Sequence, residues 1–349
     1  MGTNTLTAAR AASSSTFGTL LTLGAVVLSV SIAVAITIGP ANLSISDVYA
    51  VIIEHFGYGT ADVSRIQEGI VWELRLPRTL LAAVCGAGLA LCGTIMQSLL
   101  RNPLADPFVL GISSGASTGA VVIAVLGLGA GAISLSVGAF VGAVLSFGLV
   151  MLLAAGAGGG TSRIVLAGVA GTQLFSALTS FIVMSSADAE QTRGVLFWLL
   201  GSLSGADWTD LALCGAVTLA GLIICLGHAS ALDAFTFGNT AAASLGISVR
   251  WVRLLLLGIT ALITAALVSA AGAIGFVGLV LPHAARFLVG PLHSRLLPAA
   301  AVAGAIFMVW VDALARTIFE PQEIPVGVVT ALIGVPAFAI ILFRMRPTP

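Results

Sequence analysis

The chain has 349 residues, of which 58% belong to the AVILMFWYC class and only 8% are charged. Soluble domains are usually about 45–50% apolar and about 25% charged, so this composition excludes an ordinary globular enzyme and indicates a membrane protein. Fourteen arginines balance fourteen acidic residues, and lysine is absent, which leaves no net charge. Nucleic acid is therefore not an expected partner, because no strongly basic surface is available.

Apolar runs in chain order predict about ten transmembrane helices, because a spanning helix needs roughly 20 residues. The first run, about 17–39, follows a leader at 1–16, and its apolar stretch is longer than that of a cleaved signal peptide. The further runs cover about 78–99, 108–128, 132–155, 163–185, 208–228, 254–273, 275–290, 296–316 and 326–343. We expect an all-α polytopic membrane protein with one transmembrane domain at 17–346 and a short tail at 347–349.

Glycine spacing predicts close packing between these helices, since small residues let backbones approach. Gly115 and Gly119, and Gly127 and Gly131, have GxxxG spacing. The stretch 254–290 is broken by several glycines and a proline, and such a break is expected to be packed inside the bundle rather than to face lipid. Four cysteines inside apolar runs, without CxxC spacing, are predicted to fill the core: Cys85, Cys92, Cys214 and Cys225.

Arginine placement predicts the orientation. With the N-terminus inside, eight arginines fall on the cytoplasmic side and five on the opposite side, which favours cytoplasmic placement of both termini. The cytoplasmic set is Arg10, Arg101, Arg163, Arg250, Arg253, Arg295, Arg344 and Arg346, and the outer set is Arg65, Arg75, Arg78, Arg193 and Arg316; Arg286 lies within a predicted span and is left out of both counts. The longest inner connection then runs from about 229 to 253.

Few charged residues lie within the predicted spans. Asp312 and Arg316 are one helical turn apart and can pair, which favours a structural or interfacial role over a proton relay. His283 and Arg286 share a helix face, and packing is favoured over metal ligation because no second ligand stands at metal spacing. HExxH is absent, and a Walker lysine is impossible in a chain without lysine, so neither a catalytic site nor ATP hydrolysis is expected.

Two groups of residues at the ends of the spans or between them suggest partner surfaces. Arg75, Arg78 and Arg316 lie at the outer side, where arginines either dock an acidic partner or pair with Glu73 and Glu320; the residues alone favour neither. On the inner side, FGNTAAASLGISVRWVR predicts short amphipathic turns broken by Gly246. This segment suits either a groove on another protein or a surface lying on lipid headgroups.

Several long segments resemble the FecCD family, the permease subunits of ATP-binding-cassette importers for iron siderophores, haem and cobalamin. They are LRLPRTLLAAVCGAGLALCGTIMQSLLRNPLADPFVLGISSGAS at 74–117, TSRIVLAGVA at 161–170, GAIGFVGLVLPHAARFLVG at 272–290, LLPAAAVAGAIFMVWVDALAR at 296–316 and EIPVGVVTALIGVPAF at 323–338. The resemblance runs from about Leu74 to the C-terminus in the family's order.

The resemblance implies a multi-pass subunit of the bacterial inner membrane, paired with itself or a paralogue and surrounded by lipid. Two ATPase subunits would carry ATP and magnesium, so that this chain needs no cofactor, and an extracytoplasmic binding protein would deliver substrate. An ion-coupled secondary transporter is the alternative; it requires an essential intramembrane acid.

The resemblance also assigns residue roles. Arg75, Arg78 and Arg316 would face glutamates of the binding protein. Ala241, Ala242, Leu245 and Gly246 would couple to the ATPase, while Asn239 stands where relatives often carry an acid. Thr161 and Ser162 would form the cytoplasmic gate.

Overall fold

A computed structural model describes residues 2–39, 43–58, 62–126, 134–186, 189–320 and 322–344, and every regular element in these ranges is helical. Seven helices are long and apolar enough to cross a membrane, and three shorter apolar helices complete the ten predicted spans in this part of the chain. The ten are α1 (Gly2–Thr37), α4 (Leu76–Leu100), α5 (Ile112–Leu126), α6 (Leu135–Gly156), α7 (Thr161–Ser186), α9 (Trp208–Gly227), α12 (Val249–Ala271), α13 (Val277–Val289), α14 (His293–Thr317) and α15 (Val326–Arg344).

Three of the boundaries that differ from the expected ones have a clear local cause or consequence. Helix α1 begins at Gly2, so the predicted leader continues the first helix instead of preceding it. Helix α12 begins at Val249, which shortens the predicted 229–253 connection. Helix α5 begins at Ile112, because Gly111 adopts a left-handed conformation after the short helix η2 (Pro107–Leu110).

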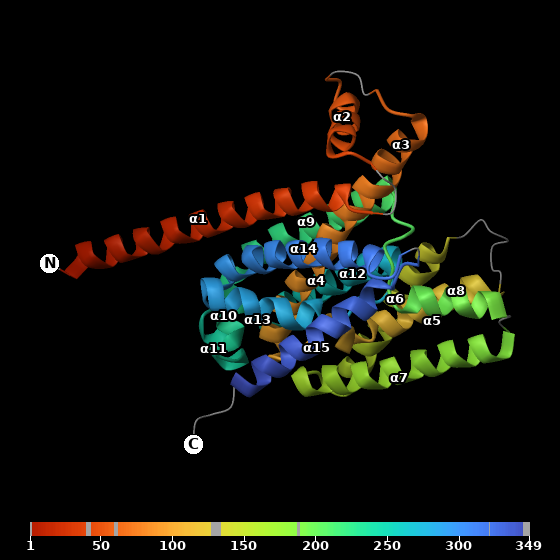
Figure 1. The fold of residues 1–349 in the computed structure, drawn as a ribbon. Helices are drawn as coiled ribbons and strands as arrows, with labels where there is room; N and C mark the ends of the chain where they lie inside the picture. The colour runs from red at the N-terminus through yellow and green to blue at the C-terminus, as the bar shows by residue number, and fades with distance from the viewer. Residues whose placement is uncertain are drawn as a thin grey trace.

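Short helices lie at both ends of the bundle. Figure 1 shows α2 (Ile45–His55) and α3 (Arg65–Gly69) projecting at one end, where α8 (Ala189–Leu199) also lies. Helices α10 (Ala229–Thr236) and α11 (Asn239–Ser244) lie at the other end, together with the start of α1 and the end of α15 (Figure 1). The two ends of the described chain are therefore on the same side, as an even number of crossings requires.

Helix α4 is the centre of the fold, and 83% of its apolar window is buried inside the chain. Glycines allow two neighbours to approach its backbone. A Cβ on Gly86 would overlap the carbonyl group of Gly304 in α14, and one on Gly93 would overlap that of Gly278 in α13. The three helices consequently pack backbone to backbone, the arrangement that small residues permit in a membrane bundle.

The expected close packing is present elsewhere too. Gly115 and Gly119 of α5 lie against Gly142 and Gly138 of α6, while Gly127 and Gly131 fall outside the described residues. The break between α12 and α13 is packed inside the bundle, as predicted, because Gly272 lies against the carbonyl of Trp198. All four cysteines are buried and unbridged, which confirms their predicted role as core residues.

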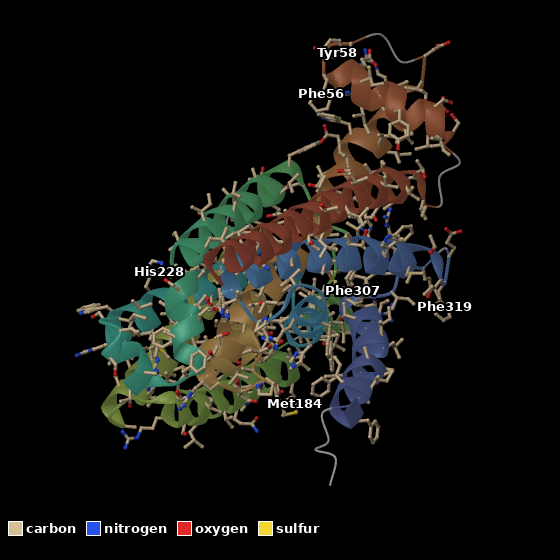
Figure 2. All side chains as sticks on the ribbon, turned by 90° about the vertical axis from the view of Figure 1, so that its left-hand side faces the viewer. Phe56, Tyr58, Met184, His228, Phe307 and Phe319 are labelled. Atoms are coloured by element: carbon tan, nitrogen blue, oxygen red, sulfur yellow. The ribbon has the colours of Figure 1, made fainter. Side chains whose placement is uncertain are left out.

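Three long helices leave most of their surface uncovered. Only 17% of the apolar window of α1, 28% of that of α7 and 22% of that of α9 is buried inside the chain. The uncovered side chains are large and apolar; Met184 of α7, for example, is 85% exposed (Figure 2). Such faces require lipid or another subunit, because water would not solvate so much contiguous apolar surface favourably.

Candidate functional site

An ionic cluster closes the α2–α3 end of the bundle. A π-helical turn, η1 (Ile70–Arg75), leads directly into α4, and Pro77 lies in the first turn of α4. Arg78 Nε donates to Asp312 Oδ1 over 2.9 Å, and Arg78 Nη1 donates to both Glu323 oxygens over 2.9 and 3.0 Å. Arg316 Nε lies 3.0 Å from Asp312 Oδ2, which confirms the predicted pairing within α14.

Two of the arginines also cap the end of α1. Arg316 donates to the carbonyl oxygens of Ile38 and Ala35 over 3.0 and 3.3 Å. Arg75 donates to those of Ile36 and Thr37 over 3.2 and 3.3 Å. The last carbonyls of a helix lack intrahelical partners and carry partial negative charge, so the two guanidinium groups satisfy and stabilise this terminus.

The structure brings the three predicted docking arginines together, but it buries them: Arg75, Arg78 and Arg316 are 6%, 9% and 5% exposed. The alternative that they pair with Glu73 and Glu320 is wrong for Arg78 and Arg316, whose ionic contacts are with Asp312 and Glu323. Asp312 is fully buried between Arg78 and Arg316, so a buried carboxylate rather than a surface acid balances these two charges. Their role in docking a partner stays a prediction.

Next to the cluster, an aromatic stack supports the projecting helices. The His55 ring stacks on Trp72 at 4.0 Å, and Trp208 lies 4.9 Å from Trp72 and donates to its carbonyl oxygen. Phe56 and Tyr58, labelled in Figure 2, remain 69% and 73% exposed. The α2–α3 end therefore presents an apolar, aromatic surface beside the buried charges.

At the opposite end, α10 and α11 form a compact pair. Ala242 is fully buried, and Gly246 follows α11 with a φ of +79°. Phe237, Leu245 and Trp251 are 83%, 72% and 69% exposed. Ala241 is partly exposed beside Ala242. The predicted coupling residues thus form one surface element in which Ala242 anchors the pair and Leu245 is presented outward.

Asn239, the first residue of α11, accepts a hydrogen bond from Arg253 at the start of α12. The guanidinium of Arg253 also lies 5.9 Å from the centre of the Phe235 ring of α10. The neutral side chain of Asn239 therefore links α11 to α12 within the chain.

The predicted gate residues begin α7 at the α10–α11 end. Thr161 is partly exposed and Ser162 is exposed, directly after the glycine turn 158–160. This turn and Arg250 and Arg253 of α12 line a cavity of about 610 Å³. The gate turn therefore faces the helix that follows Gly246. Whether the hydroxyl groups close a passage stays a prediction.

Asp106 lies in the connection between α4 and η2 and was not singled out by the sequence. Its carboxylate accepts a hydrogen bond from the N–H of Phe108 over 2.9 Å. Burial raises the pKa of Asp106 to about 6, and the Phe108 hydrogen bond opposes this increase only in part. The carboxyl group thus gains a proton more readily in the folded chain than in an unfolded one.

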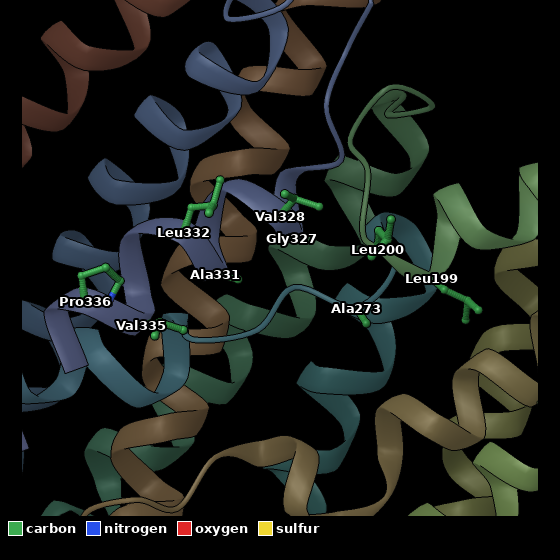
Figure 3. Close-up of a pocket in the computed structure, with 9 residues that line it drawn as sticks. All are labelled: Leu199, Leu200, Ala273, Gly327, Val328, Ala331, Leu332, Val335 and Pro336. Carbon is green, nitrogen blue, oxygen red and sulfur yellow. The ribbon is translucent and has the colours of Figure 1, made fainter. Parts of the chain in front are cut away.

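An apolar pocket of about 550 Å³ opens on the side of the bundle, where the end of α8, the α12–α13 break and α15 meet (Figure 3). Leu199, Leu200 and Ala273 lie on one side of it, and Leu332, Val335 and Pro336 of α15 lie on the other. Its lining includes no charged side chain, so this pocket suits passage or helix contact rather than tight ligation of a polar group.

Comparison with known proteins gives the family. Residues 27–344 match the FecCD transport family. The chain belongs to this family. Among curated relatives, it is 40% identical to the cobalamin import system permease BtuC of Halobacterium salinarum, over 82% of this chain and 75% of that protein. It is also 40% identical to the hemin transport system permease HmuU of Yersinia pestis, over 79% of this chain and 84% of the relative.

Another FecCD relative is the Fe(3+) dicitrate transport system permease FecD of Escherichia coli, 38% identical over 79% of this chain and 86% of that protein. A solved structure, the inward-facing conformation of a metal-chelate type ABC transporter, superimposes with a TM-score of 0.81 at 30% identity, covering 94% of this chain and all of the other. The chain is thus a multi-pass transport permease of the inner membrane.

Proposed function

We propose that this FecCD chain moves a ferric siderophore, haem or cobalamin across the cytoplasmic membrane as the permease subunit of an ATP-binding-cassette importer. The single observation that carries the proposal is the family match over residues 27–344, with relatives named for cobalamin, hemin and ferric dicitrate transport. The fold of ten apolar helices supports it.

Energy for transport comes from separate ATPase subunits. A lysine-free chain cannot build a Walker lysine, so the nucleotide and its magnesium belong to the partner. The exposed apolar side chains around α11, Phe237, Leu245 and Trp251, suit insertion into a groove on that partner. Movement of α11 reaches the transmembrane core through the Asn239–Arg253 contact with α12.

A second permease, identical or paralogous, covers the open side of the bundle. Helix α7 exposes Leu166, Phe181 and Met184, and α15 exposes Leu332 and Phe343. The pocket in Figure 3 lies beside α15, so pairing there would enclose an apolar passage between the two subunits. Weak contacts suit such a passage, since a tightly held cargo would not be released.

The α2–α3 end receives an acidic extracytoplasmic binding protein. Its exposed aromatic residues supply contact area, and the arginines beneath supply positive potential. Because Arg78 already donates to Glu323, a carboxylate of the partner would compete with Glu323 for the same guanidinium group. Docking and opening of this end are therefore linked through one ionic cluster.

Transport then follows alternating access. ATP binding draws the ATPase subunits together, displaces α10 and α11, and tilts the paired permeases so that the passage opens on one side at a time. The permease contributes contacts that differ between two states, while the partner supplies the free energy. An ion-coupled mechanism is less suited to Asp312, which is fully buried between two arginines rather than placed to exchange a proton.

The test is reconstitution in vesicles with candidate ATPase and binding-protein subunits. Uptake is measured across a panel of labelled ferric hydroxamates, ferric catecholates, haem and cobalamin. We expect ATP-dependent accumulation of one class. Failure of every chelate and cofactor, with ATPase activity intact, would contradict the proposed cargo.

A further inference from the structure

A cavity lined mostly by polar residues lies at the α10–α11 end, beside the coupling helices. Its volume is about 270 Å³, enough for several water molecules at about 30 Å³ each. It lies where the end of α4, α10, the end of α13 and the start of α14 meet. Its lining is Gln97, Ser98, Arg101, Asn102, Pro103, Thr236, Arg286, Pro291 and His293.

Two arginines face this cavity without an acidic partner. Among the described residues, neither Arg101 nor Arg286 forms an ion pair with a carboxylate. Arg286 donates to the amide oxygen of Gln97 over 3.3 Å, a neutral contact that leaves its positive charge uncompensated. Arg286 is also only partly exposed. Placing uncompensated positive charge beside a cavity favours an anion inside it.

Asp233, which contacts the cavity-lining residue His293, is already engaged. Asp233 of α10 accepts hydrogen bonds from the backbone N–H of His293 and makes a 2.6 Å contact with His293 Nδ1. On the other side of the imidazole ring, Nε2 lies 2.5 Å from Ser98 Oγ. This chain of contacts fixes the wall of the cavity from α4 to α10. It also holds the Asp233 carboxylate on His293 rather than on either arginine.

We propose that this cavity binds a phosphate group, held by Arg101 and Arg286. Guanidinium groups form paired, charge-assisted hydrogen bonds with phosphate oxygens, and the side-chain amide of Asn102 supplies a neutral donor. The group comes either from free inorganic phosphate or from the headgroup of an anionic phospholipid, since basic pockets between membrane helices bind such headgroups. Either source would brace α10 against the ends of α4 and α13.

The first experiment uses the wild-type, full-length protein in detergent and needs no variant to fold. Phenylglyoxal labelling of each arginine is followed by peptide mass spectrometry, in phosphate or in chloride at equal ionic strength. We expect phosphate to slow labelling of Arg101 and Arg286 severalfold. Arg295, in the first turn of α14 but outside the cavity lining, is the internal control and should label equally in both salts.

The second experiment repeats the labelling in nanodiscs of phosphatidylcholine alone or with phosphatidylglycerol. Protection by phosphatidylglycerol without added phosphate identifies a headgroup, and protection by inorganic phosphate in detergent identifies the free ion. The affinity for the phosphate source identified in this way should fall about tenfold in Arg101→Ala and in Arg286→Ala, and should change little in Arg295→Ala. Equal labelling of Arg101 and Arg286 under every condition would overturn the proposal.

Discussion

Arg78 and Asp312 are 234 positions apart in sequence, yet the guanidinium Nε of one lies 2.9 Å from the carboxylate Oδ1 of the other. This contact joins the first turn of α4 to the last turns of α14. Glu323 also pairs with Arg78. Arg316 pairs with Asp312 and donates to a carbonyl oxygen at the end of α1. One buried carboxylate therefore holds three helices at the end where the binding protein is proposed to dock.

Replacing Asp312 should destabilise the fold strongly. Asp312→Asn keeps the volume but leaves the buried Arg78 and Arg316 without their shared counter-charge, and loss of one partner from a buried pair costs about 3–5 kcal/mol. Thermal unfolding in detergent measures the loss. Glu323→Gln is the control, because the Glu323 side chain is 35% exposed and its loss leaves Arg78 paired with Asp312. Equal, small effects of the two changes would contradict a structural role for the cluster.

The docking proposal makes a further prediction for Glu323, the control residue of the stability test. Glu323→Gln removes the carboxylate that competes for Arg78, so affinity for an acidic binding protein should rise by up to about tenfold at low salt. The gain should shrink as salt screens the charges. Surface plasmon resonance with the binding protein at several salt concentrations measures it. Weaker docking of the Gln variant would mean that Glu323 itself contacts the partner.

Gly246 should be required for coupling. Its φ of +79° costs a residue with a Cβ about 1 kcal/mol or more, although no neighbouring atom stands in the way. Gly246→Ala should therefore shift the turn after α11 and reduce uptake per ATP hydrolysed, without unfolding the bundle. Gly258→Ala is the matched control, since Gly258 is helical with open space around it. The ratio of transport to hydrolysis in proteoliposomes is the readout, and an unchanged ratio in Gly246→Ala would argue against coupling.

Asp106 should make stability depend on pH. Because its pKa is about 6 in the folded chain and near 3.8 otherwise, the folded state holds the proton more tightly, and stability should fall as pH rises from about 4 to 6. This pKa difference corresponds to a change in unfolding free energy of about 3 kcal/mol at most, since Asp106 keeps some exposure to solvent.

Asp106→Asn keeps an acceptor for the Phe108 N–H but does not titrate. Its unfolding profile should be flatter between pH 4 and 6, and it should be more stable than the wild type at pH 7. Denaturant unfolding at each pH measures both. Superimposable pH profiles of the two proteins would show that Asp106 titrates normally.

Sequence periodicity was sufficient for the long helices, because each apolar run of about 20 residues has one stable solution in a membrane. It was insufficient where local chemistry decided the boundary. Gly111 delays α5, and the polar residues before Phe17 continue α1. Short helices such as α2 depend on capping, here between Ser44 and Asp47, rather than on apolar length.

The site was only partly predictable for a related reason. Asp312 and Arg316 are one turn apart, and their pairing follows from helix geometry. Glu323 and Arg78 are 245 positions apart and meet only through the packing of α4 on α14. The Asp233–His293 contact likewise spans 60 positions, and no spacing in the sequence predicts it. Contacts of this kind require the tertiary structure.

The most direct test of the account compares the purified permease alone with the permease assembled with its ATPase and binding protein, in sealed vesicles containing no cargo. The assembled system should accumulate a labelled chelate only when ATP is present. The lone chain should accumulate none, whether or not a proton or sodium gradient is imposed. Uphill uptake by the lone chain, driven by an ion gradient, would contradict the central claim that its power comes from a partner.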